Sequence, residues 1–365
     1  MRVLIAPDKF AGTLSAVEAA AAIAEGWRRR APDDELDLVP LADGGPGFVD
    51  ALHASLGGDL LAVTVTGPYG EQVPGSVLLD GGTAYVESAQ ACGLHLTAQR
   101  DRDPERASTY GVGELVTAAA DAGAREVCVG LGGSGTNDGG AGMLDALGAT
   151  ATPDGALTAG PTGLAKLEGV ELAAARRRVD GVRLVAASDL DNPLLGLIGA
   201  TNVHGAQKGV REDRLPTVDA TLQRLADATD RTVARAKGAG DAGGLGFALL
   251  LLGATRTPGF DVVSEAVGLA GRARRADLVI TGEGAFDFSS GSGKVPYGVA
   301  RVAAAALQPC IALAGQVLVG SREMRALGVE SAYSMVELLG EGASFADPAG
   351  SLASLAERTA RSWSR

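Results

Sequence analysis

Three of the chain's lysines lie where a cation could meet phosphate or carboxylate oxygens. The sequence has only five lysines against 27 arginines; Lys9 follows an aspartate, and Lys208 and Lys294 lie in glycine-rich turns. An ammonium group is a compact charge, and flanking glycines let a ligand approach it closely. Surface placement would explain one such lysine, but not three of five. We interpret all three as candidates for neutralising a phosphoryl group or an acidic substrate.

Residues 130–142 form a glycine-rich segment directly after an apolar, strand-like run. Such a loop, with a helix predicted to start near Gly139, presents backbone amides to an anion. Its glycines match the dinucleotide-binding spacing only formally, because polar residues replace the apolar packing residues of that motif, and no lysine follows them as in a Walker loop. We predict that the segment binds the phosphates of a nucleotide. The residues assigned to this contact are Gly133, Ser134, Thr136, Asn137, Asp138 and Gly139.

Several carboxylates follow predicted strands and could bind a metal ion or accept a proton. Asp189 and Asp191 form a pair after the strand expected at 182–187, and one or both could hold Mg²⁺. Asp8 or Asp43 could take the proton of a substrate hydroxyl as a general base. Turn or helix capping explains any single aspartate as well, whereas the pairing of Asp189 with Asp191 favours a metal site.

Short apolar runs alternate with alanine-rich runs along almost the whole chain. The apolar runs, such as residues 127–129 and 278–280, lack the alternation of a half-buried strand and are typical of strands buried on both faces. A helix is predicted over 16–30, where Ser15 and Glu18 have the spacing of a capping box. The pattern predicts an α/β protein with mainly parallel sheets and flanking helices, in which ligands bind beyond the carboxyl ends of the strands.

Length and charge restrict the architecture and the partners. A chain of 365 residues favours two domains over one. Its net charge of −12 disfavours nucleic acid and anionic membranes as partners. The three cysteines are isolated from one another, and the N-terminus turns polar too early for a signal peptide, so we expect a cytoplasmic protein.

An expected hairpin near residues 67–82 interrupts the alternation, which suggests that the chain leaves one domain there and returns near residue 280. We therefore predict a second domain inserted in the first. The first is a discontinuous α/β domain of the Rossmann or flavodoxin-like type, formed by residues 1–75 and 282–365. The inserted α/β domain spans residues 76–281 and carries the glycine-rich loop and the two paired aspartates.

Several segments, in order along residues 1 to about 320, resemble the bacterial glycerate kinase family (type I, glycerate 2-kinase-like). The longest read Gly-Gly-Ser-Gly-Thr-Asn-Asp-Gly-Gly-Ala-Gly-Met from Gly132 and Asp-Leu-Asp-Asn-Pro-Leu from Asp189. The resemblance implies two α/β domains, the second inserted in the first, with the active site between them. It also implies phosphorylation of glycerate or a similar hydroxy acid, usually at the 2-hydroxyl, with ATP and Mg²⁺, by a monomer or homodimer. The implied substrate contacts are Lys9, Ser15, Gly44, Gly45 and Asp287.

Three departures from the family pattern leave the exact substrate open. Pro46 stands where the family usually has glutamate, and Ala285 stands where it usually has arginine. His204 begins a segment that usually reads Phe-Gly-Pro-Gln-Lys-Gly and here reads His-Gly-Ala-Gln-Lys-Gly. The glycine-rich loop and the paired aspartates are retained, so the phosphate and metal chemistry is still expected.

The same residues allow three other functions. A kinase for a related small hydroxy acid would use the same groups. A phosphatase with an aspartyl-phosphate would use the paired aspartates, but Pro193 stands where such an enzyme has threonine. A nucleotide-binding homologue without catalysis would bind ATP and show no turnover. For the kinase, the candidate catalytic residues are Asp8, Asp43, Asp189, Lys208 and Lys294.

Overall fold

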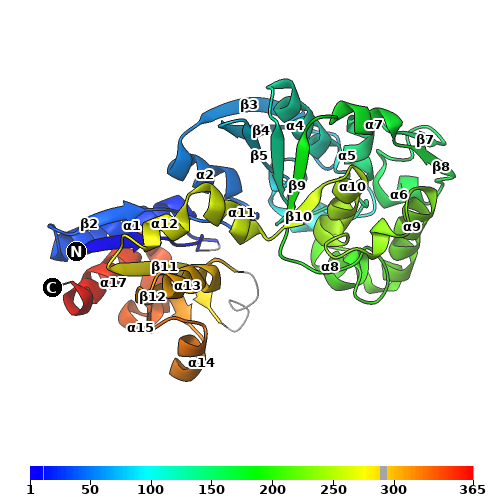
Figure 1. The fold of residues 1–365 in the computed structure, drawn as a ribbon. Helices are drawn as coiled ribbons and strands as arrows, with labels where there is room; N and C mark the ends of the chain where they lie inside the picture. Colours follow the sequence, from blue (N-terminus) through cyan, green and yellow to red (C-terminus); the bar gives the residue numbers. More distant parts are fainter. Residues whose placement is uncertain (11, 288–293, 365) are drawn as a thin grey trace. The chain divides into compact units, whose positions relative to one another are not determined.

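The computed structural model describes residues 1–10, 12–287 and 294–364, so the glycine turn at 291–293 lies outside the described residues. The chain forms two compact units (Figure 1). The first comprises residues 1–43, 50–57 and 259–365, and the second comprises residues 44–49 and 58–258. The second unit is therefore inserted in the first, as predicted from the sequence.

The two units begin and end at other residues than the predicted domains. β3 (Asp59–Thr66) pairs with β4 (Gln72–Asp80) in the second unit, so most of the stretch assigned to the end of the first domain lies there instead. At the other boundary, α11 (Gly259–Ala266) and α12 (Leu269–Ala273) belong to the first unit. Local patterns show that a strand or helix exists but not which sheet it joins or covers, and this explains both shifts.

The first unit contains a sheet of five parallel strands. Their order is β13 (Ser331–Ser334), β12 (Cys310–Val317), β11 (Leu278–Phe286), β1 (Arg2–Ile5) and β2 (Glu35–Leu38). The chain steps from β1 to β2 on one side and from β11 to β12 on the other, so the strand order reverses between β1 and β11. In open α/β sheets this reversal marks the place where ligands bind.

Helices flank this sheet and bury its apolar strands. Val3 and Ile5 of β1 pack with residues of α1 (Ala16–Arg30) and α17 (Pro348–Trp363), while α13 (Val295–Ala305) contacts β11 and β12. α1 begins and ends where the sequence predicts. The remaining helices of this unit are α14 (Ser321–Ala326), α15 (Met335–Leu339) and α16 (Glu341–Ala346), and α2 (Phe48–Leu56) lies across a unit boundary.

The second unit is built on a six-stranded mixed sheet. Its order is β10 (Thr255–Thr257), β9 (Arg183–Ala187), β6 (Glu126–Gly130), β5 (Thr83–Glu87), β4 and β3. The first four run parallel, and β4 is antiparallel to both β5 and β3. The carboxyl ends of β5, β6 and β9 therefore lie at one edge of the sheet, where the glycine-rich loop and the paired aspartates follow.

The helices of the second unit are short and packed around an aliphatic core of valine, leucine and alanine side chains. They are α3 (Ala89–Cys92), α4 (Tyr110–Asp121), α5 (Ala141–Ala146), α6 (Gly160–Leu164), α7 (Ala173–Arg178), α8 (Ala200–Lys208), α9 (Leu215–Ala228) and α10 (Leu245–Leu251). A separate two-stranded ribbon consists of β7 (Thr150–Thr152) and β8 (Gly169–Glu171). Within the described ranges, none of the helices has the length and apolarity needed to cross a membrane.

Candidate active site

Charged side chains of the first unit gather where the strand order reverses. The backbone amide of Asp8, just past β1, donates to the carbonyl of Gly282 in β11 at 2.8 Å. The Lys9 ammonium lies 3.7 Å from a carboxylate oxygen of Asp8 and 3.6 Å from one of Asp43. Three residues predicted from the sequence are thus brought together at the ligand-binding edge of this sheet.

The Asp8 carboxyl is buried, with only 6% of the residue exposed. Burial raises its pKa to about 6; the positive charge of Lys9 opposes this rise, and the negative charge of Asp43 adds to it. Lys294, the residue before α13, also acts on Asp8 through its positive charge. A carboxylate with a pKa near 6 is largely ionised at neutral pH and can still accept a proton effectively.

Ser15 and Asp287, two predicted substrate contacts of the first unit, differ in their surroundings. The Ser15 hydroxyl donates to a Glu18 carboxylate oxygen at 2.8 Å and accepts from the Glu18 amide at 3.2 Å, which forms the predicted capping box of α1. Ser15 is thereby occupied in capping, and its geometry gives a substrate contact no support. Asp287 is half-buried and follows the carboxyl end of β11, at the same edge as Asp8.

The polar side chains of the glycine-rich loop turn into the second unit. The Ser134 and Thr136 hydroxyls lie 2.9 Å apart, and both residues are buried. The Asp138 carboxylate accepts from the amide and hydroxyl of Thr109, both at 2.8 Å, and from the amides of Gly140 at 3.0 Å and Gly142 at 3.1 Å. These contacts hold the loop against α4 and α5.

Asp138 therefore departs from the prediction that it contacts nucleotide phosphate. Its own carboxylate takes up amides at the start of α5 that were expected to bind an anion. α5 also begins at Ala141 rather than near Gly139, and it has only six residues. Burial raises the pKa of Asp138, and its backbone partners oppose that rise. The geometry gives Asp138 a structural role in fixing the loop.

One face of α8 presents polar groups to this loop. Thr201, His204 and Lys208 recur at helical spacing. The Asn137 side-chain amide donates to the Thr201 hydroxyl at 2.8 Å, and the Lys208 ammonium donates to the Thr136 carbonyl at 2.7 Å. Lys208 is buried, and burial lowers its pKa to about 8. This lysine lies against the loop to which the sequence assigned phosphate binding.

Two buried polar atoms lack a hydrogen-bond partner among the described residues around the loop. They are Asn137 Oδ1 and His204 Nε2. The buried carboxylate of Asp241 lies near enough to Lys208 and His204 to feel their charges. Since buried polar groups are almost always paired, such unpaired atoms indicate a place for a polar ligand. The His204 imidazole and the Lys208 ammonium can donate hydrogen bonds to a nucleotide phosphate, whereas the unpaired Asn137 oxygen can only accept one from a donor.

The paired aspartates do not act as a pair. The two carboxylate oxygens of Asp191 contact Lys237 Nζ at 2.7 Å and Arg256 Nη2 at 2.9 Å, and the hydrogen bond from Lys237 helps to lower its pKa. The prediction that Asp191 holds a metal disagrees with this geometry, because two cations already neutralise it. Asp189 is half-buried just past β9 and is retained as a candidate.

A magnesium ion would have to draw on few protein ligands here. Within residues 1–10, 12–287 and 294–364, no three histidine, cysteine, aspartate or glutamate side chains form a metal-binding group. Mg²⁺ commonly binds through one or two carboxylates and completes its shell with water and substrate phosphates. Asp189 fits that mode of binding.

The predicted glycine contacts place backbone against backbone in the second unit. The Gly44 carbonyl accepts from the Gly132 amide at 3.0 Å, and a side chain on Gly132 would collide with Gly45. Gly133 has a φ of +79° and accepts from the Leu94 amide at 2.9 Å. Close packing alone requires these glycines, so their presence does not by itself indicate ligand contact.

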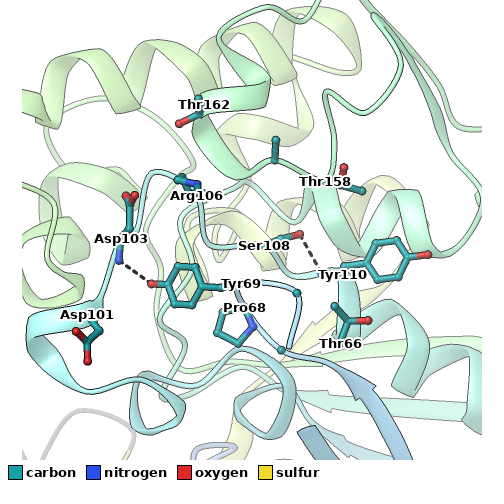
Figure 2. A pocket seen from close by; sticks show the side chains of 13 residues that line it. Thr66, Pro68, Tyr69, Asp101, Asp103, Arg106, Ser108, Tyr110, Thr158 and Thr162 are labelled. Atoms are coloured by element: carbon teal, nitrogen blue, oxygen red, sulfur yellow. Dashed lines mark hydrogen bonds between the residues drawn. The ribbon is translucent and has the colours of Figure 1, made fainter. Parts of the chain in front are cut away.

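The second unit also holds a cavity of about 620 Å³ (Figure 2). It is lined by residues that include Tyr69, Asp103, Arg106 and Tyr110. The Asp103 amide donates to the Tyr69 hydroxyl at 2.8 Å, as Figure 2 shows. Since no residue predicted for catalysis or binding lines it, size alone does not make this cavity the active site.

The sequence matches the model of the glycerate kinase family over residues 3–364. The chain belongs to the glycerate kinase family. It is 41% identical to the glycerate kinase of Bacillus subtilis strain 168 over 345 residues, which cover 92% of this chain and 90% of that protein. This family membership confirms the resemblance noted in the sequence and identifies the chain as a phosphotransferase.

Two further relatives support the family assignment. The glycerate 2-kinase of Escherichia coli K12 is 38% identical to this glycerate kinase family member over 349 residues, which cover 93% of this chain and 92% of that protein. A crystal structure from Salmonella typhimurium LT2, assigned as glycerate kinase 2, aligns with a TM-score of 0.85 and 36% identity. That alignment covers 100% of this chain and 98% of the other. The α/β fold with an inserted second unit is thus shared.

Sequence reasoning missed two residues of the second unit's polar cluster. Asp241 begins a 3₁₀ turn (Asp241–Gly244) within a glycine-rich segment, and its burial is visible only in the fold. Thr201 could have been found, because it lies seven residues before Lys208 on the same face of α8. His204, which the sequence marked only as a departure from the family pattern, joins this cluster through its unpaired Nε2.

Proposed function

We propose that this protein transfers the γ-phosphoryl group of ATP to the 2-hydroxyl of glycerate, with Mg²⁺. The observation that carries the proposal is the buried Asp8 carboxylate, whose pKa of about 6 suits a base, beside Lys9 at the strand-order reversal. Family membership supplies the reaction class, and the name of the Escherichia coli relative supports the 2-hydroxyl.

In this proposal, Asp8 accepts the proton of the substrate hydroxyl while the oxygen of that hydroxyl forms a bond to the γ-phosphorus. The bond from that phosphorus to the ADP oxygen breaks, and ADP takes the electron pair. Lys9 and Lys294 provide positive charge for the substrate carboxylate or the transferring group. Phosphoryl transfer depends chiefly on such positioning and charge neutralisation. Asp43 helps to hold Lys9 in place, since one of its carboxylate oxygens lies 3.6 Å from the ammonium.

The second unit supplies groups for the nucleotide. The Lys208 ammonium lies against the loop, where it donates to the Thr136 carbonyl, and we propose that it binds phosphate oxygens. Asp189 would hold Mg²⁺, which supplies positive charge to the β- and γ-phosphates when bound. The aspartyl-phosphate alternative would need both paired aspartates, and the ion pairs of Asp191 disfavour it.

ADP release that depends on a hydroxy acid substrate tests the proposal. The protein is mixed with ATP and Mg²⁺, and ADP is measured by a coupled assay. The assay is run without an acid and with D-glycerate, L-glycerate or another small hydroxy acid. We expect release that requires glycerate and saturates with it. ADP release that is the same with and without a hydroxy acid, or no ADP release with any of the acids, would contradict the proposed kinase activity.

The pH dependence follows from two opposed pKa shifts. The pKa of Asp8 is raised to about 6, so its base form accumulates as pH rises through 6. The pKa of Lys208 is lowered to about 8, so its charge is lost as pH rises through 8. We expect kcat/KM for ATP and glycerate to rise near pH 6 and to fall near pH 8. A profile that is flat between pH 5 and pH 9 would contradict both roles.

A further inference from the structure

A cavity of about 230 Å³ lies at the carboxyl ends of β11 and β12 in the first unit. Phe10, Met335, Val336 and Phe345 give it apolar walls, and Ala285 leaves it open on the strand side. Among the described residues that line it, none carries a charge. A buried charge without a partner is costly, so this cavity does not suit a carboxylate or phosphate.

The polar groups of the cavity leave few bonds for a ligand. The Thr13 hydroxyl donates to the Phe10 carbonyl at 2.9 Å, and the Ser344 hydroxyl donates to the Gly340 carbonyl at 2.8 Å. Gln316 also lines the cavity. Its side-chain amide makes no hydrogen bond to any part of the chain that the structure describes. The cavity therefore suits a hydrocarbon group with at most one polar substituent.

This cavity begins close to the proposed base. Phe10 follows Asp8 by two residues, and the Asp8 amide bonds to the carbonyl of Gly282. Gly284, which lines the cavity, is two residues further along β11. At a rise of about 3.3 Å per residue, the cavity wall starts about 7 Å along the strand from that contact. Asp8 does not itself line the cavity, so a carbon chain attached to the hydroxyl-bearing carbon of a substrate at Asp8 has to span that distance to enter it.

The size of the cavity indicates the size of its ligand. An apolar cavity of about 150 Å³ accepts benzene, so this one holds six carbon atoms. The hydroxymethyl group of glycerate would leave most of it empty. We propose that the cavity receives the apolar chain, about four to six carbon atoms long, of a 2-hydroxy acid larger than glycerate. This inference rests on the proposed function.

A chain-length series tests this inference directly. Calorimetry measures the Kd of 2-hydroxypropanoate, 2-hydroxybutanoate, 2-hydroxyhexanoate and 2-hydroxyoctanoate with the full chain, and the coupled assay measures kcat/KM for each and for glycerate. We expect Kd to fall about fourfold per added methylene through the hexanoate and on to the octanoate. Ala285→Leu fills the cavity and should remove this gain. Ala305→Leu, at an exposed position of α13, is the matched control and should keep it.

The two measurements separate this inference from the proposed function. A Kd that does not change along the series, or a gain that survives in Ala285→Leu, would overturn the inference even if glycerate is phosphorylated. The wild-type series decides the matter alone if Ala285→Leu does not fold. Chain-length-dependent binding without ADP release from any acid would support the cavity as a hydroxy acid site and overturn the kinase proposal.

Discussion

Asp8→Asn is expected to lower kcat at pH 7.5 by about 10³-fold, because proton transfer to a positioned carboxylate typically contributes 10²- to 10⁴-fold. Asparagine keeps the size of the side chain and removes its basicity. The measurement is the rate of ADP release at saturating ATP and glycerate. Asp261→Asn is the matched control: it changes a half-buried aspartate of the same unit that pairs with Arg301. Near-normal turnover in Asp8→Asn would remove Asp8 from its role as base.

The same substitution should make the fold more stable. The folded-state pKa of Asp8, about 6, lies above its ordinary value of 3.8. The contribution of protonated Asp8 to the stability of the fold is therefore lost as pH rises from about 4 to 6. Asparagine mimics the protonated form. At pH 7.5 the free energy of unfolding should rise by up to about 3 kcal/mol, at 1.36 kcal/mol per pKa unit. Urea unfolding of both proteins measures it, and a less stable variant would contradict this account of Asp8.

Lys208→Met should lower kcat/KM for ATP by about 10²- to 10³-fold, the usual cost of losing one charge-stabilising group in an active site. Methionine preserves much of the volume of lysine and removes the ammonium that contacts the Thr136 carbonyl. The fall of activity above pH 8 should disappear from any remaining activity. Initial rates across ATP concentrations and pH values check both effects.

A matched control is available for this lysine. Lys166→Met changes a lysine at an exposed position of the same unit and should leave kcat/KM for ATP unchanged. Circular dichroism of both variants establishes that they fold. If Lys208→Met and Lys166→Met have equal kinetics, Lys208 does not contact the nucleotide, and its burial against the loop is only structural.

The parts of this protein that local physics decides were predictable from its sequence. α1 has the predicted bounds because a capping box and an amphipathic run fix them. Asp8 and Lys9 were identifiable because they follow a short apolar run that forms the strand β1. The inserted second unit was predicted as well. Its bounds were not, because the partner of β3 is set by pairing across the sheet.

Hydrogen-bond saturation was not predictable from the sequence. Asp138 looked like a phosphate contact, but its carboxylate is filled by Thr109, Gly140 and Gly142. Asp191 looked like a metal ligand, but Lys237 and a second cation from β10 neutralise it. In both cases at least one partner comes from a distant part of the chain, Thr109 for Asp138 and both cations for Asp191, and no local pattern indicates it.

The identity of the reaction product tests the central claim most directly. Proton-coupled ³¹P NMR of the reaction of ATP, Mg²⁺ and glycerate distinguishes the two phosphoglycerates, because a phosphate on carbon 2 couples to one proton and one on carbon 3 couples to two. We predict a doublet from 2-phosphoglycerate that grows as ATP is consumed. A triplet from 3-phosphoglycerate would contradict the assigned hydroxyl, and free phosphate alone would contradict phosphoryl transfer to the acid.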